Sequence, residues 1–90
     1  MANSKSARKR IRQNEERRVR NVRVRSRLRT QISHFGRALE EGNVEQAEAR
    51  FREVESLLDR AASKGVIPRK RASRKTGRMA QRLNDLRAQA

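Results

Sequence analysis

The amino-acid sequence predicts an all-α fold, a three-helix bundle whose first helix is long enough for its N-terminal half to protrude. Three observations predict this fold. Apolar residues recur three and four positions apart in three separate stretches, a glycine follows each of the first two stretches, and the only proline opens the third. The expected helices cover about residues 4–41, 44–63 and 68–87.

The first expected helix, residues 4–41, has a C-terminal half that is patterned for packing. Its apolar residues are spaced by four, three and four, as on a helix face that covers a protein core. This stripe consists of Leu28, Ile32, Phe35 and Leu39. Either Asn3 or Ser4 can cap the start of the helix with a side-chain oxygen, and Gly42 can end it in the left-handed conformation.

The N-terminal half of the same helix lacks a face that could pack on protein. Counting back seven residues at a time from Leu28, the same face of the helix carries Asn21 and then Asn14, with arginines close beside them. The other two helices are each about 20 residues long, so they can cover only about 20 residues of the first. We therefore expect residues 1–23, called the arm from here on, to protrude. In free solution the arm should be partly unfolded, and a counter-charge should order it.

The second and third helices are also amphipathic, and with the first they are expected to form a single domain over residues 1–90. The stripe of the second helix consists of Val44, Ala47, Phe51, Val54, Leu57, Leu58 and Ala61. The stripe of the third is weaker and consists of Ala72, Thr76, Met79, Leu83 and Leu86. Asn43 and Gln46 predict a capping box at the start of the second helix, and Pro68 is expected in the first turn of the third.

The charge of the chain is large and unevenly distributed. The net charge is +15, from 25 basic and 10 acidic residues. Residues 4–37 contain 13 basic and 2 acidic residues, residues 38–63 contain 3 and 7, and residues 64–90 contain 9 and 1. Two basic segments therefore flank an acidic one. A field of this sign favours a polyanionic partner, either nucleic acid or an acidic membrane surface.

The composition argues against several other classes of protein. Cysteine is absent, which excludes disulfides, thiolate catalysis and cysteine-based zinc sites. Since no set of catalytic groups and no metal-ligand spacing is visible, we expect no enzyme, no metal and no cofactor. The single histidine, His34, falls about opposite the apolar stripe and is expected at the surface. No membrane partner is expected, because there is no long apolar run and no Trp or Tyr.

Cations occupy every side of the first helix rather than one stripe, which suits a rod surrounded by folded RNA. A second cluster opens the third helix, where the helix N-terminus adds positive potential. Both phenylalanines are expected in the core, so we predict recognition through backbone and shape rather than base stacking. The cations predicted to contact RNA are Lys5, Arg8, Lys9, Arg10, Arg12, Arg17, Arg18, Arg20, Arg23, Arg25, Arg29, Arg69, Lys70, Arg71, Arg74, Lys75 and Arg78.

The order and spacing of these residues resemble the bacterial small-ribosomal-subunit protein S20 family over nearly the whole chain. The motifs that carry the resemblance are Met1-Ala2-Asn3-x-Lys5-Ser6-Ala7-x-Lys9-Arg10, Arg17-Arg18 with Asn21, Arg25-Ser26 followed by Arg29-Thr30, Lys64-Gly65-Val66-Ile67, Ala72-Ser73-Arg74-Lys75 and Arg78-Met79. Two positions depart from the family pattern. Pro68 stands where relatives often have histidine, and Gly77 stands where serine is usual.

The resemblance implies a non-enzymatic component of the small ribosomal subunit, located on the ribosome in the cytoplasm. It implies direct binding to small-subunit ribosomal RNA, neutralising phosphates and holding RNA helices together during assembly, with few protein contacts and no homo-oligomer. Carried onto this chain, the contacts lie between Lys5 and Arg29 and between Arg69 and Arg78. They then include four uncharged residues, Asn14, Asn21, Ser26 and Ser73.

Two other functions compete with this interpretation. A nucleoid-type DNA-binding protein would have a similar size and charge, although bending proteins usually bring an apolar wedge or a dimer. A cationic membrane-active helix would need a clear apolar face. Between residues 4 and 23 only Ile11, Val19 and Val22 are large and apolar, which disfavours that alternative.

Overall fold

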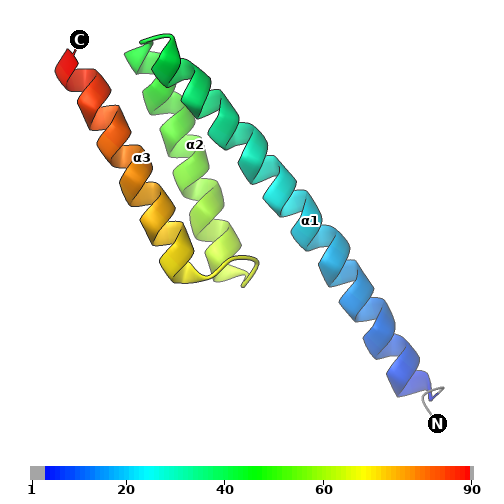
Figure 1. Cartoon of the computed structure of the whole chain (residues 1–90). Helices are drawn as coiled ribbons and strands as arrows, with labels where there is room; N and C mark the ends of the chain where they lie inside the picture. Colours follow the sequence, from blue (N-terminus) through cyan, green and yellow to red (C-terminus); the bar gives the residue numbers. More distant parts are fainter. Residues whose placement is uncertain (1–3, 90) are drawn as a thin grey trace.

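A computed structural model describes residues 4–89 of the protein, and within them it contains three α-helices and no strand. Helix α1 covers Lys5–Glu40, α2 covers Val44–Ser63 and α3 covers Arg69–Gln89 (Figure 1). The predicted all-α fold with a long first helix is confirmed, and each helix end lies within two residues of its expected position.

Helix α2 is the central element of the bundle. It packs along α1 on one side and along α3 on the other, whereas α1 and α3 hardly touch each other. Figure 1 shows α1 continuing far past the end of the bundle toward the N-terminus. The described chain is consequently elongated, with extents of 65 × 21 × 13 Å.

The turn between α1 and α2 is closed by backbone hydrogen bonds around a left-handed glycine. Gly42 has φ +69°, its N–H donates to the Leu39 carbonyl, and the Asn43 N–H donates to the Ala38 carbonyl. These two bonds form a Schellman motif, which satisfies carbonyls that the end of α1 leaves free. Gly65, with φ +77°, ends α2 in the same way.

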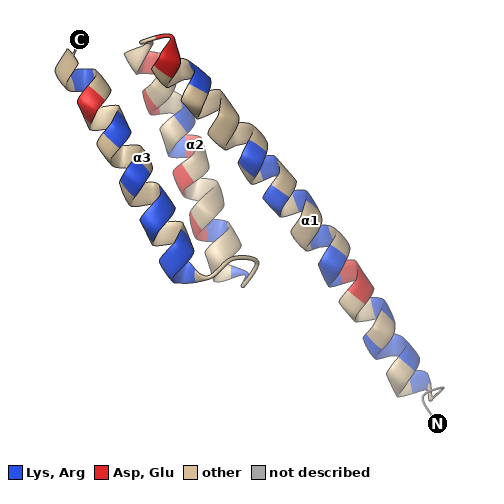
Figure 2. Cartoon of the chain, in the orientation of Figure 1, with Lys and Arg blue, Asp and Glu red and all other residues tan. Residues whose placement is uncertain are grey.

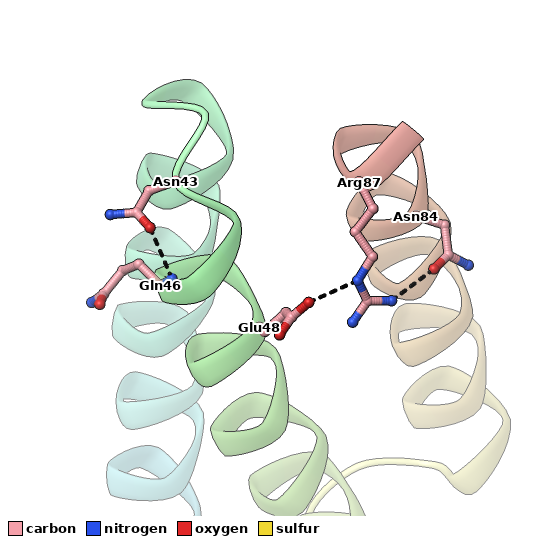
Figure 3. A network of polar contacts seen from close by, with 5 residues as sticks. All are labelled: Asn43, Gln46, Glu48, Asn84 and Arg87. Carbon is pink, nitrogen blue, oxygen red and sulfur yellow. Dashed lines mark hydrogen bonds and ion pairs between the residues drawn. The ribbon is translucent and has the colours of Figure 1, made fainter. Parts of the chain in front are cut away.

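Only half of the predicted capping box is present at the start of α2. The Asn43 side chain accepts a hydrogen bond from the Gln46 N–H at 3.1 Å, as Figure 3 shows. The reciprocal bond is not made, because the Asn43 N–H is already bonded to the Ala38 carbonyl of α1. At the start of α1, Ser4 caps the Ala7 N–H at 3.2 Å, and the alternative cap Asn3 lies outside the described residues.

Pro68 lies immediately before α3 rather than inside its first turn. Its carbonyl accepts the first helical hydrogen bond, from the Ala72 N–H at 3.1 Å, and the helix begins at Arg69. The expectation was therefore off by one residue. The physical role is nearly unchanged, since a residue at this position needs no N–H for the helix.

The core consists of small and medium-sized apolar residues from all three helices and from the turn that follows α2. Its buried members are Leu28, Phe35, Ala38, Ala47, Val54, Leu58, Ala61, Val66, Ala72, Met79 and Leu83. Phe51 and Thr76, both expected on core stripes, are only half-buried. Phe51 packs at the edge of the core, where its ring centroid is 6.1 Å from that of Phe35.

His34 is half-buried, so the expectation of a surface position was wrong. Its Nδ1 atom is buried and has no hydrogen-bond partner in the structure. One turn earlier, the Gln31 side chain accepts a weak hydrogen bond from Arg50 of α2 at 3.5 Å. This flank of α1 is therefore partly covered, which a helical wheel of α1 alone does not reveal.

The described part of the arm, residues 4–23, protrudes from the bundle as predicted. Its large apolar residues have no neighbours to pack against: Ile11, Val19 and Val22 are 65%, 38% and 53% exposed. Helix α1 is continuous through this segment. Packing supplies most helical stability in proteins, and the arm has nothing to pack on. That the free arm is partly unfolded therefore stays a prediction, which measurements of helix content with and without RNA would test.

Candidate nucleic-acid interface

The predicted contact residues of α1 are distributed around a rod that has no protein neighbour over most of its length. Asn21 is half-buried, and every other predicted residue from Lys5 to Arg29 is exposed. In Figure 2 the basic residues follow α1 down to its N-terminal end and also line α3, while most acidic residues lie on α2 and at the turn that precedes it, with a few on the lower part of α1 and near the end of α3. The arm thus offers cations in several directions at once.

One arm arginine is already engaged by a carboxylate. The Arg18 guanidinium donates to both carboxylate oxygens of Glu15, from Nε at 3.1 Å and from Nη2 at 2.6 Å. The hydrogen bond from Arg18, followed by its charge, lowers the pKa of Glu15. Glu15 therefore stays ionised, and can hold Arg18, to a pH below the usual titration range of a glutamate. A phosphate that bound Arg18 would have to compete with Glu15 for this guanidinium.

Replacing Glu15 with Gln is expected to strengthen binding to RNA several-fold, because the change removes a negative charge and releases Arg18 for a phosphate. The neighbouring change Glu16→Gln removes the same charge. Glu16 makes no ion pair within the described residues, so that variant releases no arginine. Equilibrium binding at fixed salt would compare the two. Equal gains in affinity would show that only the removed charge matters and that the ion pair with Glu15 does not restrain Arg18.

Arg25 has a structural contact that the sequence did not indicate. Its Nη2 atom donates to the Val66 carbonyl at 3.3 Å, across the turn that joins α2 to α3. This bond links the base of the arm to the segment that precedes the cations of α3. Arg25 therefore helps to fix the arm relative to α3, in addition to its predicted contact with RNA.

The predicted contact residues of α3 lie on different faces of the helix. Arg71, Lys75 and Arg78 face α1, where they line hollows between the two helices. Arg69 and Ser73 instead face α2, and the Arg69 guanidinium lies 4.0 Å from the carboxylate of Asp59. Lys70 and Arg74 are exposed and line neither side. The cluster is thus not one surface.

The α1–α3 groove is the hollow that remains because these two helices hardly touch. It consists of two parts of about 390 and 260 Å³, which share Ile32 and Lys75. Its floor is mainly apolar. Its walls carry cations from both helices, which are Arg25, Arg29, Arg71, Lys75, Arg78 and Arg82.

Arg82 is a groove residue that was not among the predicted contacts. It follows Arg78 by four positions and Lys75 by seven, and Lys75 in turn follows Arg71 by four. The four cations are therefore spaced by four, three and four, which is the spacing of one helix face. The same periodicity that identified the apolar stripes could have identified this cationic one.

The other side of α3, called the α2–α3 face from here on, has a different electrostatic character. The hollow there is lined by Glu55 and Asp59 of α2 as well as by Arg52 and Arg69. At its far end, Arg87 of α3 donates to the carboxylate of Glu48 at 2.9 Å and to the Asn84 side chain at 3.0 Å, as Figure 3 shows. The carboxylates of α2 thus balance α3 on this side, whereas among the described residues Asp85 is the only carboxylate on its groove side.

The described residues contain neither a metal-binding cluster nor a helix that could span a membrane. Within residues 4–89 no group of three or more His, Asp or Glu side chains is placed to hold a metal ion. None of the helices in the same part of the chain has the length and apolar content needed to span a bilayer.

A three-helix bundle that extends into a cationic rod defines a class of small, basic helical proteins suited to polyanions. Within that class the chain belongs to the ribosomal protein S20 family, whose model matches residues 2–84. The predicted family is thus confirmed. Members of this family are structural ribosomal proteins, so the expectations of a non-enzymatic function and of a cytoplasmic, ribosomal location are confirmed as well.

Relatives named small ribosomal subunit protein bS20 are similar to this chain over nearly its whole length. The relative from Shouchella clausii is 48% identical, with 98% of this chain and 100% of the relative aligned. The relative from Clostridium acetobutylicum is 47% identical over the same shares of the two chains. The relative from Thermobifida fusca is 49% identical, with 96% of this chain and 94% of the relative aligned.

Proposed function

We propose that this protein binds small-subunit ribosomal RNA directly, neutralises its phosphates and holds several RNA helices together while the subunit assembles. The observation that carries the proposal is the arm, in which exposed cations surround a helix that has no protein to pack on. Arginines are placed to bind phosphates bidentately, and RNA that encloses the arm would supply the contacts that the bundle does not.

The whole chain acts in this proposal as one RNA-binding unit over residues 1–90. The bundle holds α3 at a fixed distance and angle from α1, so that the two basic surfaces meet different parts of the folded RNA. The protein acts as a monomer, with few contacts to other proteins and none to a membrane. The acidic surface of α2 repels phosphate, and this gives the protein one orientation in the RNA.

A competition experiment separates this function from binding to nucleoid DNA. The protein is bound to labelled small-subunit ribosomal RNA at fixed salt, and either unlabelled folded RNA or duplex DNA is added. We expect the RNA to compete at far lower concentration, because a helix with cations on all sides matches an enclosing RNA fold better than one groove. Equal competition by the DNA would overturn the proposal in favour of the nucleoid alternative.

A further inference from the structure

The α1–α3 groove has walls of one charge and a floor of apolar side chains. Arg29 of α1 and Lys75 of α3 line its walls, and Leu28, Ile32 and Met79 lie along its floor. Asp85, at one end, is the only acidic residue that lines it. The groove thus combines cations for phosphates with apolar atoms that can cover the sugar and base of the same nucleotide.

Its position makes the groove a continuation of the arm. Arg25 and Arg29 lie on the α1 wall and follow directly from the exposed cations of the arm, the last of which is Arg23. The groove is also small, since its two parts measure about 390 and 260 Å³. A hollow of that volume can take part of one strand of RNA but cannot enclose a duplex.

We infer that the α1–α3 groove binds a single strand of the ribosomal RNA, with both of its walls on the same strand. This inference deepens the proposed function and rests on it. The favoured occupant is RNA rather than an acidic peptide, because the cations of the arm continue along α1 into one wall and the cations of α3 face them from the other. A strand bound there would connect the arm and α3 to the same RNA segment. The surface of α3 alone would only screen the charge of the RNA.

The two glycines inside helices provide a matched test. Gly36 lines the groove and Gly77 lines the α2–α3 face, and a Cβ added at either position would meet nothing within 4 Å. Neither has a positive φ, so glutamine is compatible with both backbones. Glutamine is uncharged and a better helix former than glycine. Both Gly36→Gln and Gly77→Gln should therefore raise the melting temperature of the free protein.

Binding to small-subunit ribosomal RNA should distinguish the two variants. Gly36→Gln places a side chain in the groove and is expected to weaken binding about tenfold or more, as for the loss of one charge-assisted hydrogen bond. Gly77→Gln lies on the face where carboxylates of α2 balance the cations of α3, and it is expected to lose clearly less affinity than Gly36→Gln. Equal affinities for the two variants would show that the groove is empty in the complex. If the unmodified protein did not prefer this RNA over duplex DNA, the proposed function itself would fail.

A second measurement does not depend on how the glycine variants fold. Arg29→Gln and Lys75→Gln each remove an exposed cation from one wall. If one strand touches both walls, loosening it at one wall weakens its contact with the other, so the double variant loses less affinity than the product of the two single losses. For the distant pair Arg12→Gln and Lys75→Gln, the loss of affinity in the double variant should equal the product of the two single losses. If the losses multiplied for both pairs, the two walls would contact separate RNA segments and the inference would be wrong. Displacement of the RNA from the groove by an acidic peptide would also contradict it and favour a protein occupant.

Discussion

Replacing Phe35 with alanine is expected to lower the free energy of unfolding by about 3–5 kcal/mol, the usual range for removing a buried phenylalanine. Phe35 is only 2% exposed and is the largest fully buried side chain. The core around it is built largely from alanines and medium-sized aliphatic residues, which can refill little of the space. Chemical denaturation of the free protein would measure the loss, and RNA affinity should fall with the folded fraction.

Phe51→Ala is the matched control, because it removes the same side chain from the edge of the core. Phe51 is half-buried and remains in contact with Phe35, so its loss should destabilise the protein clearly less. The sequence alone treated both phenylalanines as equal core positions. A larger loss for Phe51→Ala than for Phe35→Ala would contradict the packing described here.

Neutralising three arm cations is expected to weaken RNA binding strongly and to reduce its dependence on salt. The variant Arg12→Gln, Arg17→Gln and Arg20→Gln changes exposed residues that have no ion-pair partner within the described chain. If all three contact phosphates, the slope of log affinity against log salt should become shallower by about two. Affinity at low salt should decrease by roughly 100-fold or more. Binding titrations at several salt concentrations would measure both.

The control for that experiment changes the same number of arginines elsewhere. Arg37→Gln, Arg52→Gln and Arg60→Gln also lower the net charge by three, at exposed positions outside the arm and the groove. This variant should lose much less affinity and keep most of the salt slope. Similar losses in the two variants would indicate that the protein attracts RNA through its net charge alone, without placed contacts.

Local features of the fold could be predicted from the sequence because each depends on a few neighbouring residues. The stripe from Leu28 to Leu39 faces the core as expected, and the glycines that end α1 and α2 have the left-handed conformation. The protrusion of the arm was also predictable, since it follows from the unequal lengths of the helices and from the absence of an apolar face.

Features that depend on how two helices approach each other were not predictable in the same way. Periodicity identifies the face of α3 that packs on α2, but not the distance that α3 keeps from α1. The sequence therefore gave no sign of the groove, of the hydrogen bond from Arg25 to the Val66 carbonyl, or of the covering of His34. It also placed Arg69 and Arg71 in one cluster, although they face different helices.

The two short glycine turns have a consequence for how the protein reaches its folded form. Because each turn is short, every extensive interface joins helices that are neighbours in the sequence, α1 with α2 and α2 with α3. Chains whose contacts are this local fold in microseconds to milliseconds. The bundle can therefore form within milliseconds once its last helix is available, so an RNA that binds the protein as proposed would meet α3 and the packed half of α1 already fixed relative to each other.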